Sequence, residues 1–414
     1  MSSTLGAAIE LPCGLTLPNR LVKAAMAEAM ADDSNPGDKF IAAYTSWGSG
    51  EWGAILTGNV EVSSIYRGSN NSVAVMPSIS PTTRDAWTRW ALASQRNGTP
   101  AIVQIVHPGR QSPAKAGNRG FFDKSIAPSA IPLKLGDGIL DRVLSRTIFG
   151  TPREMTLKEI AEVVDQFTVT AKLAYESGFK GIQIHGAHGY LISQFLSSKM
   201  NVRTDAYGGT AAKRAQILID IIRAIRKEVP PSFCVSIKLN SADVAGSENL
   251  EESLEQIGLI SREQVDFLEI SGGSYENPRM AQGDNLPSIR SVQREAFFLD
   301  YARAVRERYP NIILMVTGGF RSRIGMVAAL ESNSCDLIGL ARPAAVLPSF
   351  PKDMLLNEGV KDEDAAIDLT PVKGNWLIRM LPIKILGTGV DTMYYVKQIH
   401  KMGVGQKPQP PPKV

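Results

Sequence analysis

The sequence has little of what marks disulfide-rich, metal-binding or membrane proteins. Its 414 residues include only three cysteines, Cys13, Cys234 and Cys335, which lie far apart with no CxxC or metal-type spacing. This argues against a disulfide scaffold and against a zinc site. No apolar run reaches the roughly 18 residues that a membrane helix needs, and no basic region followed by a long apolar stretch opens the chain. We expect a cytoplasmic protein that does not span a membrane.

Charge of one sign is also scarce. The formal net charge is +4, and the Lys and Arg residues are spread out instead of forming long runs. This argues against nucleic acid or a membrane surface as a partner. Hydrophobic residues make up 43% of the chain and charged residues 21%, which is typical of proteins with a sizeable core. We therefore expect a globular protein.

Short runs rich in apolar and β-branched residues recur along the chain, and each is followed by a helical pattern. The expected strands are 21–25, 54–59, 101–106, 181–185, 234–239, 266–270, 312–317 and 336–340. A single uninterrupted series of β-α units favours a closed (β/α)8 TIM barrel over an open doubly wound sheet, because no second cluster of strands is present. The predicted fold class is thus α/β, with one barrel.

Two helices have clear ends in the sequence. Thr156 and Glu159 have the spacing of a capping box, and Gly178 stands where the helix that they open should stop. A second helix is expected over 211–229, ended by Pro230.

Two regions interrupt the repeated pattern of the expected barrel, which occupies residues 1–358. Residues 108–155, between the third strand and its helix, are rich in Gly and Pro. So long a loop in a compact domain is usually functional or disordered, and we interpret it as a lid over the active site. Residues 359–414 form a C-terminal extension with one expected helix, 391–402, and a Pro-rich tail that we expect to be mobile.

The segment HGAHGY at the end of the fourth strand is the first candidate site. The chain has only four histidines, yet His185 and His188 lie three residues apart there, and Tyr190 follows. If the strand ends in a helical turn, both imidazoles face one way and can donate hydrogen bonds to one oxygen. Such a pair would polarise a carbonyl, and Tyr190 could supply a proton as general acid.

Two other interpretations of this segment stay open on these residues alone. The histidines could be ordinary core or surface residues, or HxxH could be half of a metal site. No Asp, Glu or Cys within HGAHGY completes a metal set, although ligands from distant segments are not visible in a sequence.

A second candidate site lies at the last two strands. Gly318 and Gly319 end one strand, and Arg342 follows the next. Backbone N–H groups, helix N-termini and a guanidinium at this place predict a phosphate site, which is where barrels usually hold one. A lone Gly-Gly pair more often makes a tight turn, and it is Arg342 that shifts the interpretation toward binding.

The motifs HGAHGYLISQFLS and NVRTDAYGG closely resemble the signature of the old yellow enzyme family. The similarity runs from Pro18-Asn19-Arg20 to Arg342 and covers roughly residues 5–350. The resemblance implies a barrel with FMN over its mouth. The implied cofactor-binding residues are Ala24, Ala25, Met26, Ala27, Gly58, Gln104, Lys238, Gly318, Gly319, Phe320, Ala341 and Arg342.

Within this set, the resemblance implies that Gln104 and Lys238 contact the isoalloxazine. A cation beside the pyrimidine ring would stabilise the negative charge that builds there on reduction. A lysine in the apolar strand CVSIKL is otherwise rare, although it could instead pair with a core carboxylate.

Some positions depart from the family pattern. Many members carry Arg at Lys238, Cys or Thr at Ala27, and Gly at Ala341. Lysine keeps the charge but loses the fork of donors, and Ala27 removes a side chain that could tune the flavin. An aromatic residue that some bacterial-type members place after the first strand is absent, since Ala29 is the nearest match.

The resemblance implies an ene-reductase with a ping-pong mechanism. NAD(P)H would reduce FMN, and an α,β-unsaturated carbonyl compound would then bind with its oxygen on His185 and His188 while Tyr190 supplies the proton. A homo-oligomer is compatible with this interpretation. The alternatives are another flavin-dependent barrel reductase, such as a dienoyl-CoA reductase-like or amine dehydrogenase-like enzyme, and a metal-dependent hydrolase or lyase. The former relatives carry iron–sulfur cysteines and extra domains that this chain lacks.

Overall fold

Eight parallel strands close into a barrel in the computed structural model, which describes residues 2–120, 122–136, 138–242, 249–272, 289–372 and 384–412. The barrel strands are β3 (Leu21–Lys23), β4 (Ala54–Leu56), β6 (Ala101–Val106), β9 (Gly181–Gly186), β10 (Cys234–Asn240), β11 (Phe267–Ser271), β12 (Leu314–Thr317) and β13 (Leu337–Leu340). Pairing of β4 with β6 completes the ring. The predicted TIM barrel is confirmed.

All eight expected strands form, but several are shorter than predicted. The second ends at Leu56, because the chain leaves the barrel and then forms β5 (Val60–Glu61), which pairs with β6 further toward its carboxyl end. The seventh begins at Leu314, two residues later than expected.

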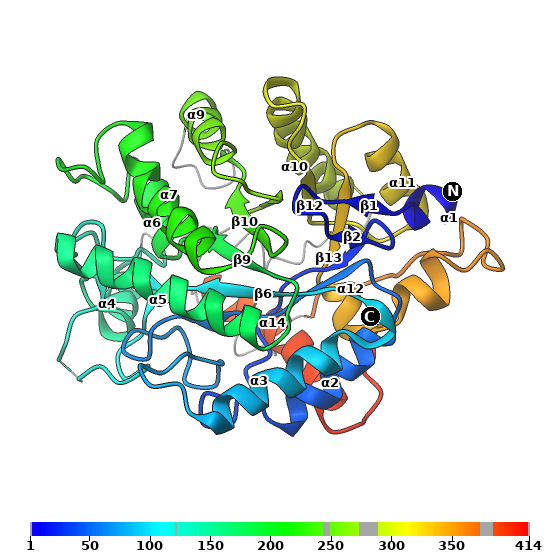
Figure 1. Ribbon diagram of the computed structural model, residues 1–414, viewed down its shortest axis with the longest axis horizontal. Coiled ribbons are helices and arrows are strands. Elements are labelled where there is room, and N and C mark those ends of the chain that lie inside the picture. The colour runs from blue at the N-terminus through cyan, green and yellow to red at the C-terminus, as the bar shows by residue number, and fades with distance from the viewer. Residues whose placement is uncertain are drawn as a thin grey trace.

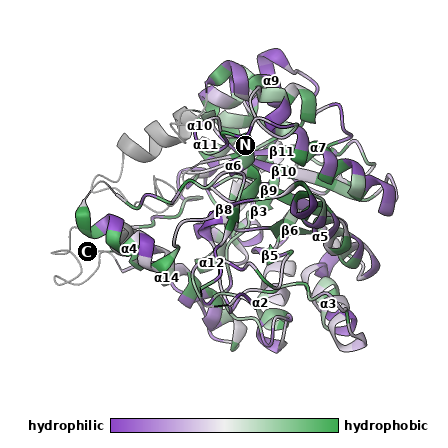
Figure 2. Ribbon diagram, turned by 90° about the vertical axis from the view of Figure 1, so that its left-hand side faces the viewer, coloured by the Kyte–Doolittle hydropathy of each residue, from purple (hydrophilic) through white to green (hydrophobic). Residues whose placement is uncertain are grey.

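Helices surround the strands, as Figure 1 shows. They are α1 (Ser2–Gly6), α2 (Asp38–Gly48), α3 (Pro81–Ser94), α4 (Ile139–Ile148), α5 (Leu157–Glu176), α6 (Leu191–Leu196), α7 (Ala211–Glu228), α9 (Leu250–Ile260), α10 (Ile289–Arg308), α11 (Arg323–Glu331), α12 (Arg342–Val346) and α14 (Lys384–Gly403). Short turns of helix occur at η1 (Arg96–Gly98), η2 (Gly109–Gln111) and η3 (Pro351–Leu355). Figure 2 shows both hydrophilic and hydrophobic residues along α5 and α7, as expected of helices with one face on the barrel.

Two predicted helix ends are confirmed. The Thr156 hydroxyl accepts a hydrogen bond from the backbone N–H of Glu159, whose carboxylate accepts from the N–H of Thr156. Gly178 follows this helix with a φ of 93°, a conformation that favours glycine. Helix α7 ends at Glu228, just before Val229 and Pro230.

A small hairpin covers the amino-terminal end of the barrel, which we call the floor. Its strands are β1 (Ile9–Glu10) and β2 (Thr16–Leu17). Leu11 and Leu17 of this hairpin belong to a hydrophobic cluster together with inward-facing strand residues such as Phe267 and Leu337. The hydrophobic effect therefore holds the hairpin against this end of the barrel.

The region between the third barrel strand and its helix contains regular structure. Strands β7 (Ile126–Ala127) and β8 (Arg153–Glu154) pair in parallel, and helix α4 lies between them in the chain. The role of residues 108–155 as a lid stays a prediction, as do the proposed domain boundaries.

The C-terminal extension returns to the barrel. Helix α14 begins before the expected residue 391, ends at Gly403, one residue later than expected, and packs against α2 and α12. The tail lies along it, since the Tyr394 hydroxyl donates to the carbonyls of Gln409 and Pro410. The mobility expected for this tail remains untested. None of the described helices combines the length and apolar character needed to cross a membrane.

Candidate active site

Polar side chains line the interior of the barrel at the carboxyl ends of the strands, which we call the mouth. Gln104 on β6 is in register with Gln183 on β9. Lys238 on β10 is in register with His185 on one side and Glu269 on the other. Neighbours in register point to the same side of a sheet, so these five side chains form one continuous polar surface.

His185 is held as a neutral hydrogen-bond donor. The ring is buried, and its Nδ1 accepts a hydrogen bond of 3.2 Å from the backbone N–H of Ala187. In a neutral imidazole the proton must then reside on Nε2. Burial lowers the pKa of His185 well below its usual value, and the neighbouring His188 and Lys238 lower it further. His185 therefore presents Nε2–H at neutral pH.

The ring of His188 also lies at the mouth, but its backbone conformation differs from that of a strand residue. The strand does not end in a helical turn, because His188 has a φ of 60° and lies in a left-handed loop before α6. Asn240 Oδ1 accepts the N–H of His188 at 3.1 Å, and Gln111 Nε2 donates to its carbonyl at 2.8 Å. These two contacts hold a conformation that is uncommon for a residue with a side chain.

The two imidazoles meet as the sequence predicted. Their ring centroids are 4.9 Å apart, with planes at 73°. His188 Nε2 lies 3.1 Å from Ser271 Oγ, a hydroxyl that can donate or accept. Burial lowers the pKa of His188 well below its usual value, and the nearby Lys238 lowers this pKa further. Both rings are therefore uncharged near neutral pH.

Tyr190 joins the same cluster. Its ring centroid is 4.8 Å from that of His185, with planes at 88°. The residue is half-buried at the N-cap of α6, and its hydroxyl lies 3.5 Å from Asn59 Nδ2. The predicted constellation of His185, His188 and Tyr190 thus exists in the fold.

Gln104 is buried and is oriented by two neighbours. Its Nε2 donates to Gln183 Oε1 at 2.7 Å, and its backbone N–H donates to Thr57 Oγ1 at 3.0 Å. Gln183 Nε2 is buried with no hydrogen-bond partner. A buried amide donor without an acceptor is costly, so this atom points to a polar group that binds at the mouth.

Lys238 has a buried counter-ion. Its Nζ lies 3.0 Å from Glu269 Oε1, and the two side chains are 4% and 0% exposed. The alternative that Lys238 pairs with a core carboxylate is therefore observed. The carboxylate makes no hydrogen bond of normal geometry through either oxygen. The pair lies next to His185, where it still contributes a charged surface to the mouth.

The segment after the first strand follows the barrel rim. Ala24 is buried, Ala25 and Met26 are half-buried, and Ala27 is exposed. A Cβ added at Gly58 would lie 2.2 Å from the Met26 carbonyl. Glycine at this position is thus required for the close approach of the two chain segments.

A buried charged cluster that the sequence analysis missed lies beside this rim. Lys23 is fully buried, donates to the Leu56 carbonyl at 2.9 Å, and sits 4.3 Å from the Trp47 ring centroid. Glu28 accepts hydrogen bonds from the Tyr44 hydroxyl and from the N–H of Gly58. Burial lowers the pKa of Lys23 to about 8 and raises that of Glu28.

The predicted phosphate segment has the backbone that a glycine pair permits. Gly318 and Gly319 have φ values of 154° and 79°. A Cβ at Gly318 would lie 2.6 Å from the ring of Phe298, and Phe320 is buried. The hydroxyl oxygen of Thr317, just before this segment, is buried without a partner.

Arg342 begins α12 and is shared with the C-terminal extension. Its Nη2 lies 3.4 Å from Asp391 Oδ2, and its guanidinium carbon is 5.6 Å from the Tyr395 ring centroid, both on α14. Ala341 precedes it as the N-cap. Arg342 thus links the start of α12 to the C-terminal extension, and its guanidinium carries five N–H donors.

These observations fit a flavin at the mouth. Buried polar atoms of Gln183 and Thr317 lack hydrogen-bond partners within the protein. Gln183 lies on the strand that carries His185, and Thr317 ends the strand that leads into the predicted phosphate segment. An isoalloxazine ring has donors and acceptors along one edge, so it suits such a surface.

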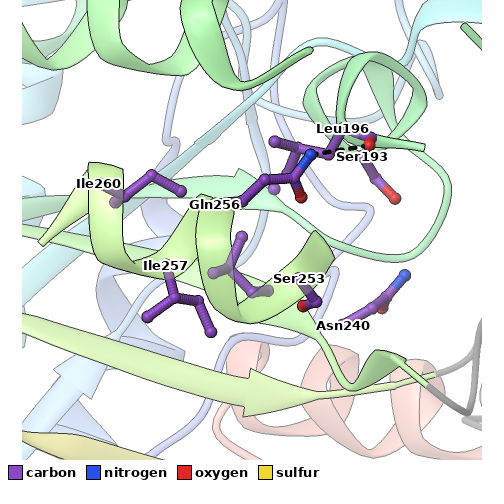
Figure 3. Close-up of a pocket in the computed structure, with 9 residues that line it drawn as sticks. Ser193, Leu196, Asn240, Ser253, Gln256, Ile257 and Ile260 are labelled. Carbon is purple, nitrogen blue, oxygen red and sulfur yellow. Dashed lines mark hydrogen bonds between the residues drawn. The ribbon is translucent and has the colours of Figure 1, made fainter. Parts of the chain in front are cut away.

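A separate pocket lies outside the barrel wall, between β9, β10, α6 and α9 (Figure 3). Aliphatic and small polar side chains line it, and Gln256 Nε2 donates to the Leu196 carbonyl at 3.0 Å across it. Asn240, which holds the backbone of His188, forms part of its wall. We assign this pocket to the support of the histidine loop, because none of the predicted cofactor residues lines it.

Sequence reasoning missed the residues that hold the site together. Asn240, Gln111 and Ser271 contact the histidine loop from three other segments, and nothing in their spacing links them to it. Glu269 and Lys23 did carry a signal, because a charged residue inside an apolar strand is rare. The same argument that identified Lys238 could have found both.

Comparisons with known proteins agree with this geometry. Residues 9–362 match the family described as NADH:flavin oxidoreductase / NADH oxidase. NADH-dependent flavin oxidoreductase iliE of Hypocrea jecorina (strain QM6a) is 45% identical over 389 residues, which cover 93% of this chain and 97% of that protein. 12-Oxophytodienoate reductase 2 of Arabidopsis thaliana is 31% identical over 278 residues, covering 66% and 68% of the two chains.

Solved structures share the fold. Morphinone reductase superposes with a TM-score of 0.69 at 22% identity, covering 86% of this chain and 90% of its own. The old yellow enzyme homologue from Zymomonas mobilis gives a TM-score of 0.68 at 20% identity, covering 88% and 97%.

Proposed function

Because this chain belongs to the NADH:flavin oxidoreductase / NADH oxidase family and is of the old yellow enzyme type, we propose that it is an FMN-dependent ene-reductase. It is an oxidoreductase that uses flavin and nicotinamide cofactors. The proposed reaction is the NAD(P)H-driven reduction of the activated C=C bond of an α,β-unsaturated carbonyl compound. The proposed order is ping-pong, in which the oxidised nicotinamide leaves before the second substrate binds.

The observation that carries this proposal is the convergence of two neutral imidazoles and a phenol at the barrel mouth. His185 offers Nε2–H because its Nδ1 is already an acceptor. His188 lies beside it with its ring 4.9 Å away. Two neutral donors polarise a carbonyl oxygen without the desolvation cost of a buried cation. This arrangement favours negative charge that develops on the substrate oxygen.

Tyr190 is proposed as the proton donor. Its ring packs edge-on against His185, so that its hydroxyl is carried beside the oxygen-binding pair. A phenol is a competent general acid when the developing carbanion is a strong base. The chain thus supplies orientation of the substrate, charge stabilisation and one proton.

When bound, the flavin would supply the redox chemistry by taking a hydride from the nicotinamide and returning it to the substrate. Gln104, Lys238, Gly58 and the segment 24–27 are proposed to hold its ring. Gly318, Gly319, Phe320, Ala341 and Arg342 are proposed to hold its phosphate. The GxGxxG match at 48–53 ends α2 and leads into β4, instead of following a strand and opening a helix. It therefore lacks the context that would hold a second phosphate, so FMN is favoured over FAD.

A metal-dependent hydrolase is less well supported. Within the described residues, the group with metal-type geometry consists of Cys13, Cys234 and Asp266, and it includes neither histidine. His185 and His188 are also beside the buried cation Lys238, which would repel a metal ion.

The cofactor proposal is tested by releasing and weighing the flavin from purified protein. We expect FMN, and we expect Arg342→Ala to retain it less tightly because a charge-assisted contact to the phosphate is lost. Recovery of FAD, or equal FMN retention by the variant, would contradict the proposal.

The histidine roles are tested by titrating the oxidised protein with a simple phenol. A phenolate oxygen should take the place of the polarised carbonyl, and stacking on the flavin should give a long-wavelength charge-transfer band. His185→Ala and His188→Ala should each weaken binding by about 1.5–3 kcal/mol, the range for a hydrogen bond to a charged group, with FMN still bound. Chelators should have no effect. The assignment would be wrong if both variants bound phenol as tightly as the wild type, or if a chelator abolished activity.

A further inference from the structure

A cluster of two thiols and a carboxylate lies at the floor of the barrel, away from the mouth. Cys13 is carried by the turn between β1 and β2, Cys234 is the first residue of β10, and Asp266 immediately precedes β11. One ligand atom from each side chain lies within 4.8 Å of the other two. The fold thus brings together cysteines that are 221 positions apart in the chain (234 minus 13).

We infer that Cys13 and Cys234 are a peroxide-sensitive thiol pair, which hydrogen peroxide converts into a disulfide that links the N-terminal hairpin to the barrel floor. The two cysteines differ in access, since Cys13 is half-buried and Cys234 is fully buried. A reactive thiol at the surface with a second thiol beside it is the usual arrangement in redox-sensitive pairs.

The local backbone lets the sulfur atoms approach. Cys13 sits in a tight turn, in which the Leu11 N–H donates to the Leu15 carbonyl at 2.9 Å. The next residue, Gly14, has a φ of 83° and open space where a Cβ would stand. Gly14 thus leaves open space beside the turn, while Cys13 itself packs against the floor cluster that contains Cys234. A hydrogen bond from Cys234 lowers the pKa of the Cys13 thiol, which favours the nucleophilic thiolate.

The reaction balances with one peroxide molecule. The Cys13 thiolate attacks one peroxide oxygen, the O–O bond breaks, and the departing hydroxide takes up a proton to leave as water. The Cys234 sulfur then attacks the sulfenic acid at Cys13, so that an S–S bond forms and the S–O bond breaks. The proton of the Cys234 thiol joins the departing hydroxide, which leaves as the second water molecule. In sum, two thiols lose two electrons and two protons, and hydrogen peroxide becomes two water molecules.

A metal ion suits the same cluster less well. Asp266 Oδ2 already accepts the N–H of Val235 at 2.7 Å and pairs with Arg226 Nη2 at 2.8 Å. A divalent cation bound to Asp266 would lie close to the Arg226 guanidinium, which would repel it. Burial also raises the pKa of Cys234 well above its usual value, so a second thiolate ligand is disfavoured.

The experiment uses the full-length, flavin-loaded protein. The reduced protein is treated with hydrogen peroxide, its remaining thiols are alkylated, and its peptides are analysed by mass spectrometry without reduction. We expect a peptide containing Cys13 joined to one containing Cys234, with the loss of two hydrogen atoms, and reversal by dithiothreitol. The linked protein should also resist urea more strongly, because a long loop is closed in its unfolded state.

Matched variants identify the pair. Cys335→Ser should cross-link like the wild type, because that thiol is buried at another place and its pKa is raised to about 12. Cys13→Ser and Cys234→Ser should each abolish the link. Since Cys13 lies on a half-exposed turn, Cys13→Ser remains a fair test even if Cys234→Ser does not fold.

Three results would overturn the inference. Oxidation that stops at sulfenic or sulfinic acid on Cys13 would show that Cys234 does not reach it. Dimers joined through Cys13 would show an intermolecular reaction instead. Zinc that co-purifies with the protein and protects both thiols from alkylation would make the cluster a metal site.

Discussion

The two ends of the barrel interior are built from the same strands yet have opposite chemistry. On β11, Phe267 faces inward at the floor and packs among aliphatic side chains, whereas Glu269 faces inward at the mouth and pairs with Lys238. On β9, Gly181 lies at the floor, and His185 lies at the mouth. These two strands thus change from apolar or glycine to polar within two or four residues.

This difference separates stability from chemistry. The floor buries apolar area without unsatisfied polar groups of its own strands, which is the dominant favourable contribution to folding. The mouth holds buried polar atoms of Gln183 and Thr317 without hydrogen-bond partners, which is unfavourable for folding alone. Such groups are expected where a ligand completes the hydrogen bonds.

The largest effect should come from breaking the floor. Phe267→Ala removes a side chain that is 1% exposed and should cost about 3–5 kcal/mol of unfolding free energy, the usual range for a buried phenylalanine. Urea denaturation measures this loss, while the flavin spectrum and the mouth should remain unchanged. The control is Tyr190→Phe, which removes one oxygen and should move the urea midpoint much less. Equal losses in the two variants would remove the proposed division of roles.

The next largest effect should come from the mouth. Tyr190→Phe should slow oxidation of the reduced flavin by an enone on the order of 10²-fold or more, the range for loss of a general acid. Reduction of the flavin by NAD(P)H needs no proton donor and should stay nearly intact. Stopped-flow spectroscopy separates these two steps. If both slow equally, Tyr190 has a structural role.

Acid should destabilise the mouth before the floor, because buried neutral histidines lie at the mouth. His107, just after β6, is 1% exposed, and burial lowers its pKa to about 3. Below the unfolded value of about 6.5 the unfolded chain binds the proton and the folded chain does not. The stabilising contribution is therefore complete above this pH and declines as the pH falls toward 3.

The matching variant is His107→Gln, whose amide oxygen can still accept the N–H of Gly109 that His107 Nδ1 accepts. Between pH 6.5 and 5, the unfolding free energy of the wild type should fall more steeply than that of the variant. The difference should be up to about 1.4 kcal/mol per pH unit, which is the limit for one proton. Urea denaturation across this range gives the slopes. Parallel plots of unfolding free energy against pH for the two proteins would show that His107 binds its proton as readily in the folded as in the unfolded chain.

The smallest effect should come from the ion pair at the mouth, and it tests whether this pair tunes the flavin potential. Glu269 neutralises Lys238 at 3.0 Å, so Glu269→Gln should leave an uncompensated cation beside the proposed flavin site. We expect reduction to become about tenfold more favourable, which is about 30 mV for a two-electron couple. Lys238→Gln should shift the potential in the opposite direction. Potentiometric titration that gives the wild-type value for both variants would place the flavin away from this pair.

Local pattern was enough to predict the eight strands, the capped helix that starts at Leu157, and the meeting of His185, His188 and Tyr190. The physical reason is that strands and caps depend on residues close in sequence. A parallel barrel also places the carboxyl ends of all strands at one rim, so candidate residues after different strands could be expected to converge.

Only the tertiary structure showed which distant groups support these residues. Asn240 and Gln111 hold the left-handed backbone at His188, and Glu269 forms an ion pair with Lys238. The wide spacing of the cysteines argued against a site, yet the fold places Cys13 against Cys234. Such contacts are set by how the chain closes on itself, because residues that are far apart in sequence share no local pattern.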